Sequence, residues 1–367
     1  VEAAASSGGS IMPPVMGVAA FVVAALTTVP YSSVIVAAVI PALAYFFCLF
    51  LSVSFQARKQ KIKVTFVYPK FTFEIKKLFS LLIPNVLSGG IVQINQFVGI
   101  IFASSISGAI SWLYYADRIV QLPLGIFIIS ITTIMLTVLS KEKVNEASKI
   151  QKINSSFMLI LTITFLCVVG LLVISDLIVD VLFKRGKFGY GDAKATSDAI
   201  VMYAIGLPAF GLIKLFSTIF FSRQNTTIPF YISIMSMILN IYLLFLLVDE
   251  LGHLGIALSL SLTSWFNALV LYILLHYRGY WYIKRNILYN IFKLIIVSSI
   301  TFFLLYCGYA FTIYTDIITI ADIYSKIILL VSLILFSIFC FLIFSYVIGL
   351  ISYKNLISKN IWGLYEG

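Results

Sequence analysis

Residues 112–125 read WLYYADRIVQLPLG, which places an aspartate and an arginine inside a stretch apolar enough to cross a lipid bilayer. A guanidinium at the centre of a bilayer costs about 3 kcal/mol on insertion scales, so such residues usually face a water-filled cavity and mark the path of a substrate. Asp117 and Arg118 are therefore the leading candidates for a functional site.

The composition around this stretch predicts an all-α polytopic membrane protein. Hydrophobic residues make up 61% of the chain, charged residues make up 11%, and the mean hydropathy is +1.08. Apolar runs of about 20 residues are long enough to span a bilayer as helices. We expect about ten such helices, at residues 11–28, 32–53, 78–104, 112–140, 157–183, 199–221, 228–248, 254–276, 291–311 and 327–352.

The 25 basic residues are distributed unequally between alternate loops. Placing the loop from Arg58 to Lys77 in the cytoplasm and alternating along the chain puts eighteen basic residues inside and four outside. This bias is typical of membrane topology, so the net charge of +11 does not indicate nucleic-acid binding. We also find no nucleophile and base pair, HExxH or GxxxxGK[ST] motif, and no metal-ligand spacing among the four cysteines and two histidines. An enzyme and a metal cofactor are therefore not expected.

Residues 1–59 differ in composition from the rest of the chain, being rich in alanine, glycine and valine. Residues 6–17 read SSGGSIMPPVMG and would interrupt a helix twice, which hydrocarbon tolerates only around a buried site or cavity. This segment resembles the large membrane subunit of TRAP transporters in its fused form, where the loop belongs to a substrate- and sodium-binding hairpin. Gly-Gly and Pro-Pro pairs also mark ordinary kinks, and both interpretations stay open. Because position 1 is valine, we expect the chain to begin inside a longer reading frame.

From about residue 61 onward, five motifs occur in one order: QINQ at 93–96, WLYYADRIVQLPLG at 112–125, FKRGKF at 183–188, GLPA at 206–209, and residues 220–229. In these motifs the chain resembles the C-terminal half of the MurJ (MviN) lipid II flippase family. The resemblance implies the MOP-exporter (MATE-like) fold, in which two six-helix lobes face a central cavity. We expect a TRAP-like fragment at 1–59, a basic cytoplasmic loop at 60–77, a six-helix C-terminal lobe at 78–276, and two further helices at 277–367 that form a groove for a lipid tail. The N-terminal lobe is expected to be missing.

One face of the 112–140 helix carries most of the predicted substrate contacts. A period of 100° per residue brings Tyr114, Arg118, Gln121, Gly125 and Thr132 onto one polar stripe. A guanidinium there can hold a pyrophosphate through a planar fork of donors. Asp117 and Gln121 are predicted to orient the group, and Gln96 and Lys214 are further candidates for substrate binding. The alternative for both Arg118 and Lys214 is that the side chain extends to the nearest headgroups.

A coupling cation is a weaker possibility, with Asn95 and Asn240 as candidate ligands. Members of the resembled family often carry a carboxylate where this chain has Gly99. One turn after Asn240 stands Leu244 rather than an acid. A sodium site would therefore lack its acidic ligands, and the membrane potential is the other candidate source of energy.

We expect a flippase for lipid II, a lipid-linked peptidoglycan precursor with a pyrophosphate headgroup, in the bacterial inner membrane, present as an incomplete or fused copy surrounded by membrane lipids. Export of another polyprenyl-linked oligosaccharide is one alternative. A sodium-dependent dicarboxylate permease built on residues 1–59 is another. A fused gene product or assembly artefact with only a structural role, or with no role, is a third.

Overall fold

A computed structural model describes residues 31–59, 73–141, 145–315 and 323–350. The chain forms two compact units, Val1–Thr72 and Phe73–Gly367. In the first unit the described part is one helix, α3 (Tyr31–Lys59), with Pro41 inside it and Arg58 and Lys59 in its last turn. The helix predicted at 11–28 and the loop at 6–17 lie outside the described residues.

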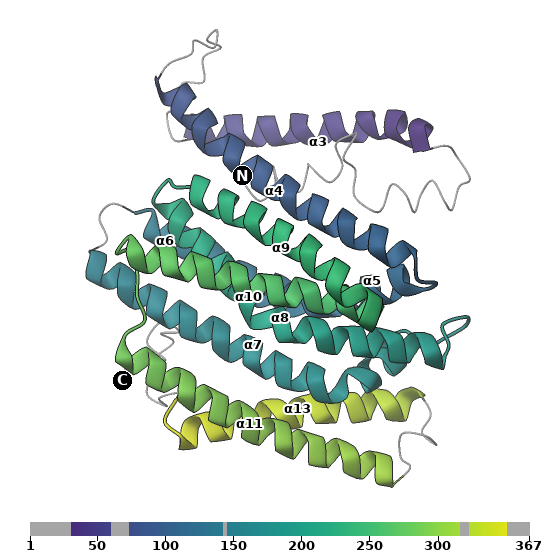
Figure 1. The fold of residues 1–367 in the computed structure, drawn as a ribbon. Coiled ribbons are helices and arrows are strands. Elements are labelled where there is room, and N and C mark those ends of the chain that lie inside the picture. The colour runs from purple at the N-terminus through teal and green to yellow at the C-terminus, as the bar shows by residue number, and fades with distance from the viewer. Residues whose placement is uncertain (1–30, 60–72, 142–144, 316–322, 351–367) are drawn as a thin grey trace. The chain divides into compact units, whose positions relative to one another are not determined.

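The second unit is an up-and-down bundle of long helices (Figure 1). Its elements are α4 (Phe73–Ser104), α5 (Ala109–Pro123), a π-helical turn η1 (Leu124–Ile128), α6 (Ile129–Leu139), α7 (Glu146–Leu182), α8 (Tyr190–Ser222), α9 (Thr227–Leu251), α10 (His253–Tyr277), α11 (Arg285–Tyr314) and α13 (Ile323–Val347). Helix α8 lies at the centre, in contact with α10, α7, α5 and α6. Helix α9 packs between α10 and α4, while α11 and α13 pack on α7.

In the described ranges, nine segments are long and apolar enough to cross a membrane. Each corresponds to one of the predicted spans, which confirms the all-α polytopic fold. Several helices are longer than predicted: α7 begins at Glu146, where the Asn145 side chain accepts a hydrogen bond from the Ala147 backbone N–H, rather than at residue 157. Hydropathy detects the apolar part of such a helix but not the polar turns that extend beyond it.

Small residues allow α8 and α10 to pack closely. A Cβ atom added at Gly206 would lie 2.9 Å from the Cα of Ser261, and the Ser261 hydroxyl donates to the Met202 carbonyl at 2.7 Å. The Ser261 hydroxyl thus bonds between the two helices, whereas the hydroxyls of Ser259 and Thr263 donate to carbonyls of α10 itself.

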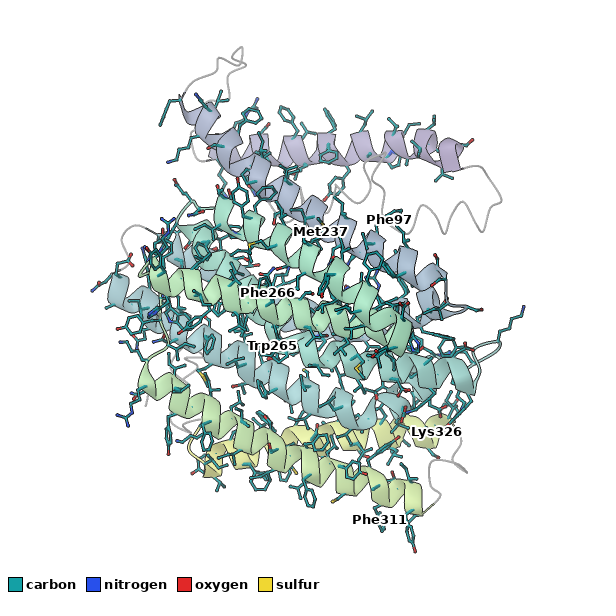
Figure 2. The ribbon with its side chains drawn as sticks, viewed as in Figure 1. Phe97, Met237, Trp265, Phe266, Phe311 and Lys326 are labelled. Atoms are coloured by element: carbon teal, nitrogen blue, oxygen red, sulfur yellow. The ribbon has the colours of Figure 1, made fainter. Side chains whose placement is uncertain are left out.

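The last two helices attach to the lobe through α7. Eight apolar residues from α7, α11 and α13 form a separate buried cluster: Val169, Val173, Ile174, Leu177, Val181, Leu305, Leu330 and Leu333. At one end of this cluster the Lys326 ammonium lies 2.7 Å from the Asp180 carboxylate, which also pairs with Lys184 at 2.7 Å. Figure 2 labels Lys326 near the start of α13. This ionic contact fixes α13 to the end of α7.

Candidate functional site

The candidate site lies on a span that is interrupted by a π-helical turn. Pro123 ends α5, because proline has no N–H to donate and clashes with the preceding turn. The turn Leu124–Ile128 follows at once, and α6 continues the span. Such a bulge changes the register of the helix, since its hydrogen bonds reach one residue further. Thr132 is buried and donates to the Ile128 carbonyl, whereas Arg118 is exposed, so the predicted polar stripe does not continue on one surface as far as Thr132.

Four of the predicted substrate residues come together on α5. The Arg118 guanidinium lies over the Tyr114 ring, 4.6 Å from its centroid, and donates to the side-chain oxygen Oε1 of Gln121 at 3.4 Å. The Gln121 amide nitrogen in turn donates to the Asp117 carboxylate. Gln121 therefore connects Asp117 with Arg118.

The two charged residues of this cluster face different surroundings. Asp117 is half-buried and interacts electrostatically with Tyr203 of α8, which is buried. Arg118 is exposed, and its guanidinium contacts only neighbours on α5 among the described residues. The sequence analysis did not name Tyr203, because only the packing of α8 against α5 brings it near Asp117. The arrangement holds a cation at an open surface while its acidic neighbour is turned inward.

The remaining predicted substrate residues are not part of this cluster. Gln96 is exposed on α4, next to the exposed Phe97 labelled in Figure 2. Lys214 is exposed on α8, three helical turns from Tyr203 along the same helix. No side-chain hydrogen bond or ion pair joins either residue to Arg118 among the described residues.

The candidate ion ligands form a polar contact between α4 and α9. The Asn240 amide nitrogen donates to the Asn95 side-chain oxygen at 2.8 Å, and Asn240 is 3% exposed. The Asn240 side-chain oxygen has no hydrogen-bond partner among the described residues. Leu244, one turn later, is fully buried. Gly99 faces α10, where an added Cβ would contact Ile256 at 3.7 Å. The seam therefore holds neutral amides rather than acids.

The bundle of α4 to α10, with two appended helices and a cationic side chain within a membrane-length segment, defines the class: a polytopic membrane protein with a MOP-exporter-like lobe. A solved structure described as "Lipid II flippase MurJ, inward closed conformation" has this fold. The aligned region covers 93% of this chain and 65% of the chain in that structure, with a TM-score of 0.65 and 24% sequence identity.

The sequence profile described as "Lipid II flippase MurJ" matches residues 10–323. The chain belongs to the lipid II flippase MurJ family. A "Probable lipid II flippase MurJ" of Rhizobium meliloti (strain 1021) is 37% identical over 247 residues, which are 66% of this chain and 46% of the relative. One of Rickettsia prowazekii (strain Madrid E) is 38% identical over 201 residues, which are 54% of this chain and 40% of the relative.

The chain thus spans less than half the length of these two relatives. The profile match begins at residue 10 and so includes most of the segment that resembles a TRAP permease. That resemblance stays a hypothesis about residues 1–59.

Proposed function

We propose that this chain acts as the C-terminal lobe of a flippase that carries lipid II across the bacterial inner membrane. The observation that carries the proposal is the exposed guanidinium of Arg118 within a membrane-length segment, held over the Tyr114 ring and against Gln121. The names of the relatives supply the substrate class. Translocation of a lipid-linked headgroup requires no bond to be made or broken by the protein, so the activity is transport and not catalysis.

The residues of the α5 cluster have different roles in this proposal. Arg118 binds the pyrophosphate, because its planar fork of donors matches two phosphate oxygens and it stays charged. Gln121 and Asp117 set the direction of that fork through their hydrogen bonds. The Tyr114 ring packs against the guanidinium. Gln96 and Lys214 would contact other parts of the headgroup. The surface between α11 and α13, which carries many exposed apolar residues, would hold the polyprenyl tail among membrane lipids.

In this proposal an N-terminal lobe forms the second half of the cavity. The relative from Rhizobium meliloti is long enough to contain such a lobe, because the match covers only 46% of it. The end of the bundle where α7 begins would face the cytoplasm. In the described residues that end carries Lys76, Lys77, Lys141, Lys149, Lys152, Arg223, Arg278, Lys284, Arg285 and Lys293, whereas the opposite end carries Lys184, Arg185, Lys187, Lys194 and Lys326. A coupling cation would have to bind at Asn95 and Asn240 without a carboxylate, so the membrane potential is the better candidate source of energy.

A hybrid flippase tests this function. Residues 73–367 replace the corresponding C-terminal part of a full-length relative, such as that of Rhizobium meliloti, in cells depleted of their own flippase. We expect the hybrid to restore growth and lipid II translocation. Arg118→Ala and Arg118→Lys should both abolish translocation, because an ammonium cannot reproduce the fork.

The matched control is Arg278→Ala, which removes an exposed arginine from the end of α10 and should leave translocation unchanged. Normal translocation by the Arg118→Ala hybrid would eliminate this site. Rescue by Arg118→Lys alone would show that the residue is an interfacial anchor rather than a pyrophosphate ligand.

A further inference from the structure

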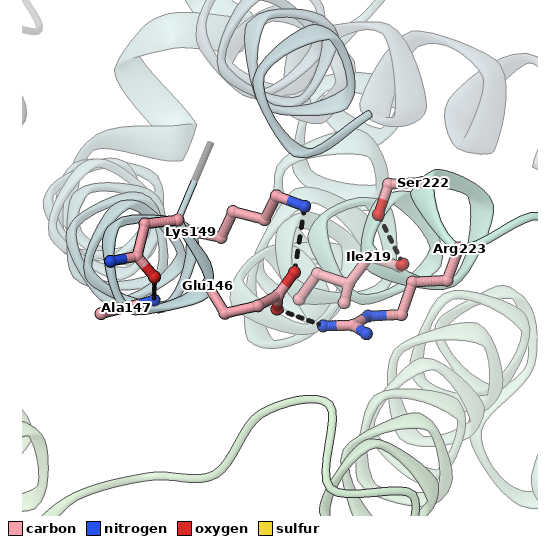
Figure 3. Close-up of polar contacts among 7 residues, drawn as sticks. Glu146, Ala147, Lys149, Ile219, Ser222 and Arg223 are labelled. Atoms are coloured by element: carbon pink, nitrogen blue, oxygen red, sulfur yellow. Dashed lines mark hydrogen bonds and ion pairs between the residues drawn. The ribbon is translucent and has the colours of Figure 1, made fainter. Parts of the chain in front are cut away.

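A second charged site lies at the end of the bundle where α6 ends, α7 begins and α8 ends. Here a pocket opens between the three helices. Figure 3 shows the polar contacts of Glu146, Lys149 and Arg223 at this place. Its apolar wall consists of Leu139, Ile150, Ile153 and Ile219, and its polar rim consists of Glu146, Lys149, Ser222 and Arg223. None of these residues belongs to the α5 cluster.

Two cations of this pocket converge on one carboxylate. The Lys149 ammonium lies 3.0 Å from one oxygen of Glu146, and the Arg223 guanidinium lies 3.1 Å from the other. The Lys149 side chain is 15% exposed, while the Glu146 side chain is 60% exposed. Arg223 also lies over the Tyr280 ring, 4.4 Å from its centroid, which fixes the guanidinium plane. The cations are thus held in place, whereas the anion between them is open to exchange.

We propose that this pocket binds the phosphate group of an anionic phospholipid, and that Glu146 occupies the position of that phosphate when the lipid is absent. One carboxylate leaves a net positive charge between the two cations. An exposed ion pair contributes little free energy, so a competing anion can displace Glu146 at small cost. The two charged oxygens of a phosphodiester can accept hydrogen bonds from the Arg223 guanidinium. They can also accept one from the Lys149 ammonium, which approaches from another side.

The surroundings of the pocket favour a lipid over a free phosphate. The four apolar wall residues provide a surface for the first carbons of an acyl chain, which inorganic phosphate does not have. The adjoining segment contains Tyr280, the exposed Tyr282, Lys284 and Arg285, a combination of aromatic and basic residues typical of the headgroup level of a membrane. The site is independent of the transported substrate and of the proposed flipping activity.

Lipid binding to the purified chain of residues 1–367 tests the proposal. Delipidated protein in neutral detergent is titrated with phosphatidylglycerol, and bound lipid is counted by native mass spectrometry. We expect phosphatidylglycerol to bind more tightly than phosphatidylcholine. Arg223→Ala should weaken phosphatidylglycerol binding about tenfold, the equivalent of one charge-assisted hydrogen bond. Arg278→Ala, which removes an equal charge at the same end of the bundle, should have no effect.

Glu146→Gln distinguishes a binding pocket from an ordinary ion pair. If the carboxylate competes with the lipid, removing its charge should tighten phosphatidylglycerol binding severalfold. Weaker or unchanged binding in Glu146→Gln would overturn the proposal, as would equal losses in Arg223→Ala and Arg278→Ala. Displacement of the lipid by millimolar inorganic phosphate would assign the pocket to free phosphate instead. Arg223→Lys keeps the charge if Arg223→Ala fails to fold, and it should bind with intermediate affinity.

Discussion

The contact between α8 and α10 predicts a sharp response to one added methyl group. In Gly206→Ala the new Cβ would lie 2.7 Å from the Ser261 hydroxyl oxygen and 2.9 Å from the Ser261 Cα. The Cα belongs to the backbone, so the two helices must separate. Separation weakens the bonds from Ser261 to the Met202 carbonyl and from the Trp265 indole to the α8 backbone.

The magnitude follows from these contacts. Overpacking of this kind costs about 1–3 kcal/mol, and each interhelical hydrogen bond in a membrane contributes about 0.6 kcal/mol. Alanine regains about 0.5–1 kcal/mol of helix propensity relative to glycine. The free energy of unfolding should therefore fall by about 1–3 kcal/mol. Reversible unfolding of the purified chain in mixed detergent micelles, followed by tryptophan fluorescence and circular dichroism, measures this change.

Gly170→Ala is the matched control. Gly170 lies in the interior of α7, and an added Cβ there would meet no atom within 4 Å among the described residues. The substitution should be neutral or stabilise the protein by up to about 1 kcal/mol. If Gly206→Ala unfolds at the same detergent fraction as Gly170→Ala, close packing at Gly206 does not hold the two helices together, and the reasoning is refuted.

Three further predictions concern the attachment of other elements. A double-mutant cycle of Asp180→Asn and Lys326→Met should give a coupling energy of about 1–3 kcal/mol, measured by unfolding in detergent, because both side chains are largely shielded; additive losses would contradict a direct ion pair. Trp281→Phe should cost about 1–2 kcal/mol in the same assay, since the buried indole donates to the Asn154 side chain at 2.6 Å, and unaltered stability would show that this bond contributes nothing. Replacing sodium with potassium should leave translocation by the hybrid unchanged, because the α4–α9 seam holds amides rather than acids, and a sodium requirement would reverse that conclusion.

The spans were predictable because each carries its own signal. An apolar run of about 20 residues needs no partner to be recognised, and the spans from 32 to 352 all correspond to helices of the structure. The turns beyond the apolar run carry no such signal. Helix α8 begins at Tyr190, nine residues before the predicted start at Ala199, and its first turns contain Asp192, Lys194 and Asp198.

Side-chain register and pairing could be predicted only in part. Arg118 and Gln121 share a face because they are three residues apart on a regular helix, and they do hydrogen bond. Thr132 lies beyond the π-helical turn, so the count of 100° per residue fails for it. Lys326 and Asp180 are 146 positions apart, and no local pattern of either helix predicts their contact. Local periodicity predicts which residues share a face only as far as the next break in the helix. Which residues of different helices pair can be seen only in the tertiary structure.

The different surroundings of Asp117 and Arg118 have a consequence for how a charged site is built in a membrane. If both side chains were exposed, the carboxylate would compete with a phosphate for the guanidinium. Asp117 instead is half-buried toward α8 and receives its hydrogen bond from Gln121, while Gln121 accepts one from Arg118 with its other end. Through Gln121, Asp117 thus orients the Arg118 guanidinium without neutralising its charge. If Arg118 binds phosphate as proposed, Gln121→Glu would place a second carboxylate against it and should abolish translocation by the hybrid while keeping the helix intact, whereas Gln121→Ala would lose only the orientation.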